Sequence, residues 1–190
     1  MEGKGRRKVA WGVTGAGDQL ENTLRVMKDI KAEYADRVEI EVYLSKMGGM
    51  VVKIYGIHGE LEEAFGKVMV EKSANSPFIT GRLQLGVFEF LLLAPATSNT
   101  VAKLAHGISD TMLTNGAIQA LKAFVPVYVM PVDYREGSTV TVLPNGKELR
   151  LRVRKEDAEN VRRISAMDGI TTFEKPEEIR EIFRERFGAA

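Results

Sequence analysis

Short apolar segments alternate with amphipathic segments over the first two thirds of this sequence, and this alternation constrains the fold more than any other feature. Residues 9–13, 38–44, 88–94 and 125–132 have the length and composition of β-strands. Residues 88–94 are so apolar that they predict a central parallel strand with both faces covered. Apolar residues between 20 and 34 recur at helical spacing. Strands alternating with helices predict right-handed βαβ units, and therefore an α/β fold of three layers around a mostly parallel sheet.

Other segments of this region have weaker patterns. Residues 47–55 and 60–71 are expected to be helical, whereas residues 73–86 are expected to form a loop around Pro77. A further helix is expected over residues 111–124.

After residue 133 the pattern changes. Alternating runs at 138–142 and 148–153 flank an Asn-Gly pair, which is a strong signal for a β-hairpin. Amphipathic helices are expected to follow, to about residue 187. We therefore expect a single domain over residues 1–190, with a core of about 8–133 and a C-terminal hairpin and helices of about 138–190.

Composition excludes several classes of protein. The 190 residues contain no Cys, so the chain has no disulfide, thiolate nucleophile or cysteine-bound metal cluster. A formal charge of +1 gives no reason to expect nucleic acid as a partner. No apolar run approaches the roughly 20 residues that span a membrane, and the first residues do not resemble a signal peptide, so a cytoplasmic protein is expected. Two isolated His residues and scattered acids have no metal-ligand spacing, so no metal is expected.

Charged residues are scarce in one long segment. Between residues 87 and 132 the only charged side chains are those of Glu89, Lys103, Asp110 and Lys122. This segment is therefore expected to form much of the buried core.

Glycines and polar residues stand directly after three of the predicted strands. Gly15, Ala16 and Gly17 follow the first strand, and Ser45 follows the second. The most apolar strand is followed by four consecutive hydrogen-bonding side chains, those of Thr97, Ser98, Asn99 and Thr100. In an open α/β sheet, ligands bind outside the carboxyl ends of the strands, so these residues form the candidate site.

Each of these features also has a purely structural interpretation. The glycines between residues 15 and 17 could form a turn and nothing more, although they also let backbone N–H groups approach a phosphate. Ser45 is a common N-cap residue, and the polar group at 97–100 could cap a helix as well. One cap needs one or two polar side chains, however, so four at this position favour a ligand site.

Two positions in the sequence indicate which kind of nucleotide the candidate site would bind. A dinucleotide site needs a third glycine where this sequence has Leu20, and an acidic residue where it has Ser45. A hydroxyl group suits a phosphate better than a ribose diol. A mononucleotide such as FMN therefore fits better than NAD.

Two motifs carry a resemblance to a known superfamily. Residues 95–113, PATSNTVAKLAHGISDTML, resemble the signature of the flavoproteins that include FMN-dependent cysteine decarboxylases and flavin prenyltransferases. Residues 10–17, AWGVTGAG, are similar more narrowly to archaeoflavoproteins and dihydromethanopterin reductases. The resemblance covers about residues 8–133, and it implies a flavodoxin-like (Rossmann-like) fold that binds FMN.

The resemblance also implies roles for particular residues. Gly15, Ala16, Gly17 and Ser45 would hold the phosphate end of FMN. Thr97, Ser98, Asn99 and Thr100 would line the isoalloxazine side, with Pro131 and Val132 nearby.

The same resemblance implies a homo-oligomer, a trimer or a multiple of trimers, with flavin near the subunit contacts. The predicted helix at 111–124 carries the small residues Gly116, Ala117 and Ala120, which allow close helix contact. This helix is therefore expected at a subunit contact.

Departures from the superfamily pattern bear on the reaction. The histidine base of the decarboxylases would fall near Gly81, and neither Gly81 nor Arg82 can replace it. Their asparagine after the fifth strand corresponds to Asp133, and their substrate-clamp cysteine has no counterpart. The Arg-Glu-x-Pro-Leu element of the prenyltransferases is also missing, because residues 135–137 lie displaced and lack the proline.

We therefore expect an FMN-binding redox flavoprotein, an oxidoreductase that transfers electrons or reduces a pterin-like acceptor. A ferredoxin-type protein is a candidate electron donor. Two alternatives stay open: a decarboxylase-like or prenyltransferase-like enzyme with an altered active site, and a non-catalytic flavin-binding protein.

Overall fold

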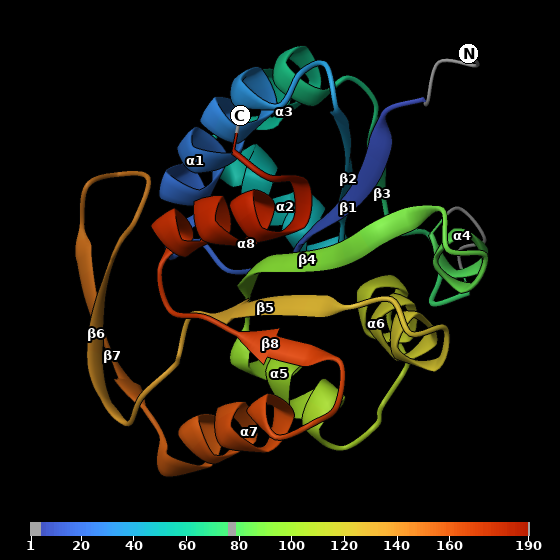
Figure 1. Cartoon of the computed structure of the whole chain (residues 1–190). Helices are drawn as coiled ribbons and strands as arrows, with labels where there is room; N and C mark the ends of the chain where they lie inside the picture. The colour runs from blue at the N-terminus through green and yellow to red at the C-terminus, as the bar shows by residue number, and fades with distance from the viewer. Residues whose placement is uncertain (1–4, 76–78, 190) are drawn as a thin grey trace.

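The computed structural model describes residues 5–75 and 79–189. Its main feature is a sheet of six strands in the order β3-β2-β1-β4-β5-β8, and every neighbouring pair is parallel (Figure 1). The strands are β1 (Arg7–Val13), β2 (Val38–Leu44), β3 (Val68–Val70), β4 (Phe88–Ala96), β5 (Val127–Pro131) and β8 (Ile170–Thr172). The chain runs outward from β1 in one direction and from β4 in the other, so a topological switch point lies between these two strands.

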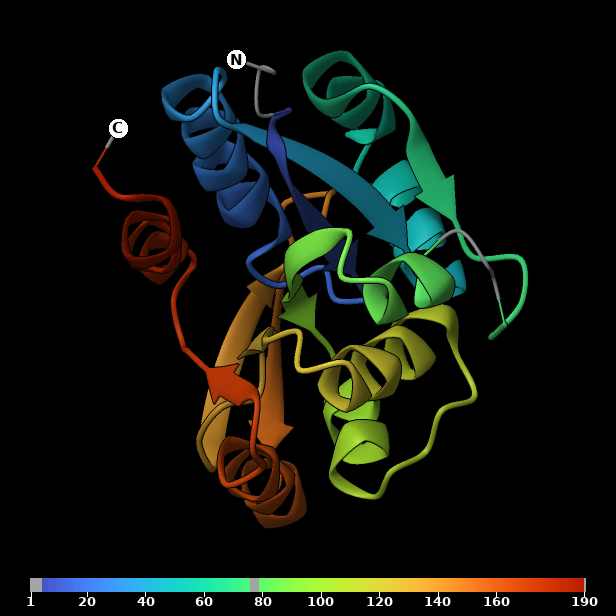
Figure 2. The same cartoon turned by 45° about the vertical axis from the view of Figure 1, so that its right-hand side comes forward.

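Helices cover both faces of the sheet, as the two views show (Figures 1 and 2). One face packs against α1 (Leu20–Glu33), α2 (Lys46–Ile54), α3 (His58–Phe65) and α8 (Ile179–Phe187). The other packs against α4 (Thr80–Gln84), α5 (Ser98–Ala105), α6 (Met112–Lys122) and α7 (Lys155–Ser165). A short 3₁₀ helix (Pro176–Glu178) precedes α8. The predicted three-layer α/β fold is confirmed.

The central strand β4 explains why this arrangement has two cores. Phe90 and Leu92 belong to the hydrophobic cluster on one face, and Leu91 and Leu93 belong to the cluster on the other. Successive side chains of a strand point to opposite faces, so a continuous apolar run supplies both layers. The same run therefore places the end of β4, with its polar turn, in the middle of the sheet.

Two predictions for the first half were wrong in detail. The helix expected over 60–71 ends at Phe65, because Gly66 adopts a positive φ of 78° that terminates helices, and β3 follows it. The loop expected over 73–86 contains the helix α4. The Pro77 part of that prediction lies outside the described residues.

The C-terminal part contributes to the main sheet as well as to its surroundings. The predicted hairpin is present as β6 (Gly137–Val142) and β7 (Glu148–Val153), which pair antiparallel in a separate sheet. The strand β8 was not predicted, and it extends the main sheet by pairing with β5. Among the described residues, no helix is both long enough and apolar enough to cross a membrane.

The small residues of α6 face the interior of the subunit. Ala117 and Ala120 are fully buried, and a Cβ on Gly116 would lie 3.4 Å from the Leu83 side chain of α4. The expectation that this face of α6 forms a subunit contact is therefore wrong. Its small residues let α4 and α6 pack closely within one subunit.

Candidate functional site

The loop after β1 and the turn after β4 are joined at the switch point by Thr14. Its hydroxyl donates to the carbonyl oxygen of Pro95 at 2.9 Å and accepts a hydrogen bond from the backbone N–H of Thr97 at 2.9 Å. The Thr14 side chain is buried, so these bonds hold the two chain segments rigidly. The glycine loop and the polar turn therefore form one unit.

The glycines of this loop pack closely against α2. A Cβ on Gly15 would lie 2.8 Å from the Met47 Cβ atom, and a Cβ on Gly17 would lie 2.3 Å from the Tyr55 hydroxyl. The Met47 Cβ atom is fixed to its backbone, so a side chain at Gly15 would force the backbone to shift, whereas the Tyr55 hydroxyl ends a flexible side chain that could move aside. The glycines therefore bring the backbone of the loop against the beginning and end of α2, which sequence analysis did not foresee.

Ser45 serves as the N-cap of α2, so its structural interpretation is correct. Its Oγ atom accepts a hydrogen bond from the backbone N–H of Gly48 at 2.9 Å. A Cβ on Gly48 would lie 2.3 Å from the Val13 carbonyl oxygen, so α2 begins directly against the end of β1. The hydroxyl proton of Ser45 is donated to no described residue, and Ser45 lines a cavity.

The four polar side chains after β4 have different roles. Thr97 caps α5 by accepting from the Thr100 N–H at 3.2 Å, and the two threonine hydroxyls lie 3.1 Å apart. Ser98 donates to the carboxylate of Asp133, which follows β5. The exposed Asn99 side chain bonds to none of the described residues. Capping thus accounts for the Thr97 side chain alone, and the Asn99 amide has no hydrogen-bond partner among the described residues.

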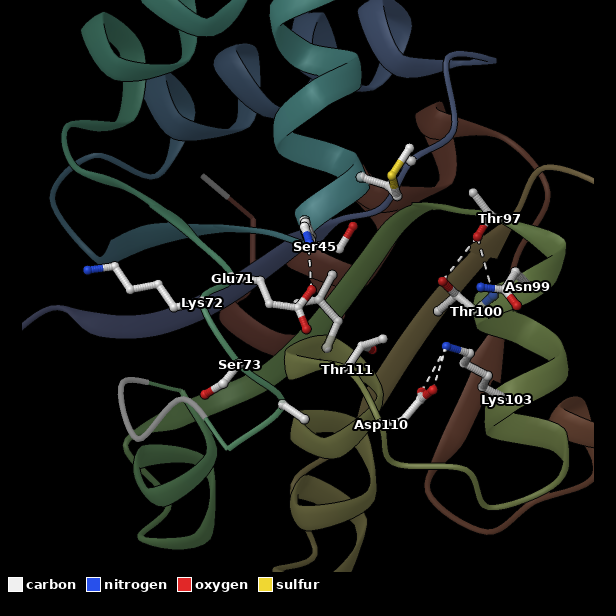
Figure 3. Close-up of a pocket in the computed structure, with 15 residues that line it drawn as sticks. Ser45, Glu71, Lys72, Ser73, Thr97, Asn99, Thr100, Lys103, Asp110 and Thr111 are labelled. Carbon is white, nitrogen blue, oxygen red and sulfur yellow. Dashed lines mark hydrogen bonds and ion pairs between the residues drawn. The ribbon is translucent and has the colours of Figure 1, made fainter.

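A cavity of about 530 Å³ opens at this edge of the sheet (Figure 3). Its lining residues come from the loops after β1, β2, β3 and β4 and from the start of α6. They are Gly15, Ser45, Lys46, Met47, Glu71, Lys72, Ser73, Ala74, Thr97, Asn99, Thr100, Lys103, Asp110, Thr111 and Leu113. Five of the ten predicted site residues are therefore brought together here.

The other five predicted residues line neighbouring cavities. Ala16, Gly17, Ser98 and Val132 line a cavity of about 290 Å³ under the β6–β7 hairpin, which shares Thr97 and Asn99 with the larger one. Pro131 and Val132 line a third cavity of about 410 Å³, also beside the hairpin. All ten predicted residues thus lie at the carboxyl edge of the sheet, in three adjoining cavities that share lining residues.

Glu71 is a residue of the large cavity that sequence analysis missed. Its Oε2 atom accepts from the Lys46 N–H at 2.9 Å, and its Oε1 atom accepts from the Met112 N–H at 2.7 Å. The carboxylate therefore lies between the N-termini of α2 and α6, where the helix dipoles favour negative charge. Glu71 follows the unpredicted strand β3, so no sequence pattern had placed it.

A second charged group of the cavity is an ion pair. The Lys103 Nζ atom of α5 lies 2.8 Å from Asp110 Oδ1, and it donates to Asp110 Oδ2 at 2.9 Å (Figure 3). Lys103 and Asp110 are two of only four charged residues between positions 87 and 132, and this scarcity could have identified them as candidate site residues.

Asp18 directly follows the glycine loop, and its carboxyl group has a raised pKa. Burial raises the pKa of its carboxyl group, the backbone N–H of Gln19 opposes this effect, and the charge of Asp133 adds to it. Both carboxyl groups line the 290 Å³ cavity under the hairpin. Within residues 5–75 and 79–189, no group of three or more His, Asp and Glu side chains could hold a metal ion.

The position expected for a decarboxylase base is structural here. Gly81 lies within α4, and the neighbouring Arg82 forms a double hydrogen bond to Glu41 of β2 at 2.5 and 2.7 Å. Arg82 therefore anchors α4 to the sheet.

These features define a doubly wound α/β protein with a mononucleotide-sized cavity at its topological switch point. The chain belongs to the Flavoprotein family, whose model matches residues 2–181.

Two relatives from Methanocaldococcus jannaschii are similar over nearly the whole chain. An uncharacterized protein is 46% identical over 92% of this chain and 93% of its own length. A dihydromethanopterin reductase (acceptor) is 33% identical over 94% of this chain and 96% of its own. The second alignment spans 239 positions, so that relative contains residues for which this 190-residue chain has no counterpart.

Solved structures resemble the chain as well. DmrB of Burkholderia xenovorans, in complex with FMN and described as a cubic protein cage for redox transfer, has a TM-score of 0.80 and 33% identity, with 96% of both chains covered. TvaF, an FMN-dependent cysteine decarboxylase, has a TM-score of 0.58 and 18% identity, with 96% of both chains covered, which supports the fold alone.

Proposed function

We propose that this chain is an FMN-binding oxidoreductase that transfers electrons or reduces a pterin-like acceptor. The observation that carries the proposal is the 530 Å³ cavity at the switch point, in a chain that is 33% identical to FMN-bound DmrB and to a dihydromethanopterin reductase. Ligand cavities of small molecules have volumes of about 300–1,000 Å³, so the cavity suits a mononucleotide.

The residues at the cavity fit FMN. Ser45 retains a hydroxyl proton for a phosphate, and Gly15 places no side chain in the way. The Asn99 amide is free to bind the polar edge of a flavin ring. When bound, FMN supplies the redox chemistry, and the protein supplies binding, orientation and electrostatics.

We assign the remaining predicted residues to the same site by position. Ala16 and Gly17 would approach the phosphate end, and Thr97, Ser98 and Thr100 would fix the turn beside the ring. Pro131 and Val132 would lie near the ring from the end of β5. This assignment is supported by their common position at the carboxyl edge of the sheet.

Decarboxylase and prenyltransferase activities are not favoured. Gly81 has no side chain to act as a base, and Arg82 is engaged with Glu41. Asp133, which replaces the asparagine of the decarboxylases, accepts a hydrogen bond from Ser98.

The electrons would come from a donor outside this chain. No cysteine is available in these 190 residues to ligate an iron–sulfur cluster. We propose a ferredoxin-type donor, which would supply electrons one at a time to the bound flavin.

We also propose a homo-oligomer, a trimer or a multiple of trimers. The related DmrB is described as a cubic cage. In this chain, α2 has an exposed apolar face of Met47, Met50 and Ile54, with exposed fractions of 53%, 53% and 61%. Met47 also lines the large cavity, so a neighbouring subunit on this face would lie beside the flavin.

We further infer that residues 1–190 form one flavoprotein domain. The hydrophobic cluster on one face of the sheet extends from Val9 to Phe187 along the chain, and the other extends from Ala10 to Ile170.

The first test is cofactor identity and affinity. Purified protein should contain FMN, and the flavin-free protein should bind added FMN more tightly than riboflavin, which lacks the phosphate. Protein that neither contains nor takes up FMN would overturn the proposal.

The second test separates a reductase from an electron carrier. The FMN-loaded protein is reduced with dithionite, the excess reductant is removed, and a dihydropterin is added without oxygen. Reoxidation of the flavin with formation of a stoichiometric amount of tetrahydropterin supports the reductase. Reoxidation by an oxidised ferredoxin, but not by the dihydropterin, supports the carrier.

A further inference from the structure

The ion pair of Lys103 and Asp110 lies in the wall of the large cavity, on the same side as the polar turn. Lys103 lies four residues after Asn99 and three after Thr100, so it is a neighbour of both on the surface of α5. Figure 3 shows the Lys103 ammonium group directed toward Asp110, from below Asn99 and Thr100. A ligand that contacts Asn99 would therefore lie about one helical turn from this pair.

Lys103 differs from the other two lysines of the cavity. Lys46 and Lys72 are exposed, whereas the Lys103 side chain is only 20% exposed and is held in position by Asp110. Glu71 is similarly fixed, but both of its oxygens accept backbone N–H groups at the starts of helices. The Asp110 side chain is 57% exposed, so Lys103 is the more shielded charge of the pair and acts more strongly on a nearby ligand than a freely solvated charge would.

We propose that the Lys103–Asp110 pair sets the reduction potential of the flavin in this cavity. Lys103 stabilises the reduced form, and Asp110 limits that effect. The proposal rests on the proposed function, since it requires FMN to occupy the cavity. An ion pair at a protein surface contributes little to stability. A stabilising role therefore does little to explain why this pair lies in the cavity wall.

The direction of each effect follows from charge balance. An external reductant gives the oxidised ring two electrons, and the ring takes up one proton from water, so the reduced ring has one more negative charge. A cation nearby favours this product, and an anion disfavours it. Loss of Lys103 must therefore lower the potential, and loss of Asp110 must raise it.

Four variants test these opposite signs. Lys103→Met and Asp110→Asn each remove one charge of the pair, and Lys103→Arg retains the cation. Lys122→Met is the matched control, because it removes a lysine charge at the exposed end of α6, outside the cavity. For each protein, the affinity for oxidised FMN is measured by titration. The midpoint potential is then measured at pH 7 by reduction with dithionite in the presence of a reference dye.

The expected result is a change in the relative affinity for reduced and oxidised FMN. Lys103→Met should weaken binding of reduced FMN about tenfold more than binding of oxidised FMN, which lowers a two-electron potential by about 30 mV. Asp110→Asn should shift the potential upward, while Lys103→Arg and Lys122→Met should stay within about 10 mV of wild type, about a twofold change. If Lys103→Met does not retain flavin, the proposal is tested by whether Asp110→Asn raises or lowers the midpoint potential.

Three outcomes would overturn the proposal, and they can be told apart. If the wild-type protein binds no FMN, the proposed function fails, and this inference fails with it. If the wild type binds FMN but Asp110→Asn leaves the potential unchanged or lowers it, only the role of the ion pair is refuted. A shift in Lys122→Met as large as that in Lys103→Met would also refute it, because the effect would then reflect total charge.

Discussion

Glu41 on β2 accepts hydrogen bonds from three side chains, and we expect its loss to change how stability depends on pH. Arg82 donates at 2.5 and 2.7 Å, the Tyr43 hydroxyl at 2.9 Å and Lys8 Nζ at 3.2 Å. Burial raises the pKa of the Glu41 carboxyl group, but these donors outweigh it and lower the pKa from 4.5 to about 2. The perturbation is Glu41→Gln, which removes the titrating group and keeps its size.

The sign and magnitude follow from the shift in pKa. Because the pKa is lower in the folded state than in the unfolded chain, the stabilisation is complete above about pH 5 and is lost as the pH falls toward 2. One pKa unit corresponds to about 1.4 kcal/mol, so the full shift is worth about 3 kcal/mol. The Arg82 and Lys8 side chains are 31% and 32% exposed, and screening by water reduces the contribution to about 2 kcal/mol.

Urea denaturation of the flavin-free protein at pH 7 and pH 2.5 measures this contribution. Between pH 7 and pH 2.5 both proteins share any loss of stability that comes from other groups. The wild type should lose most of the 2 kcal/mol in addition, whereas Glu41→Gln should show no such additional loss. Glu89→Gln is the matched control, because Glu89 lies on the adjoining part of the sheet with only a 3.9 Å contact to Arg7. The reasoning is refuted if wild type and Glu41→Gln lose the same free energy of unfolding.

Three further perturbations test the site and the assembly. Gly48→Ala should lower the free energy of unfolding by about 1–3 kcal/mol in urea denaturation, because its Cβ would lie 2.3 Å from the Val13 carbonyl oxygen. Gly59→Ala is the control, because a Cβ at Gly59 would meet open space, and it should not lower the free energy of unfolding. If both variants lose the same free energy of unfolding, the packing argument is contradicted. Asn99→Ala should weaken FMN binding by about 1–3 kcal/mol in a fluorescence titration with stability unchanged, so unaltered affinity would remove Asn99 from the site. Met50→Lys should reduce the assembled mass in light scattering, and an unchanged particle would exclude this face of α2 as the contact.

The interior strands could be predicted from the sequence, and the edge strands could not. The run at 88–94 is apolar on both faces because β4 is covered by helices on both sides, so composition alone indicated its place. By contrast, β3 and β8 have three residues each, which is too short for an alternating pattern. They are strands because β2 and β5 offer them parallel partners, and such long-range pairing leaves no local pattern.

Some residues of the candidate site could likewise be predicted from the sequence, and others could not. Ser45 and the turn at 97–100 were predicted, because caps and polar clusters after strands are local features. The reason for the glycines was missed, since it depends on Met47 and Tyr55. Glu71 was also missed, because its role requires α2 and α6 to meet after the chain has folded.

The placement of β8 at the end of the sheet means that one edge of the sheet stays unpaired until late in synthesis of the chain. A nascent chain that has reached β5 still exposes the outer backbone groups of that strand, and open strand edges promote aggregation. These groups are covered only when the hairpin and α7 have been synthesised and β8 has paired with β5. Premature termination between β5 and β8 would therefore leave an unpaired, aggregation-prone edge beside the candidate site, whereas β8 covers that edge in the folded chain.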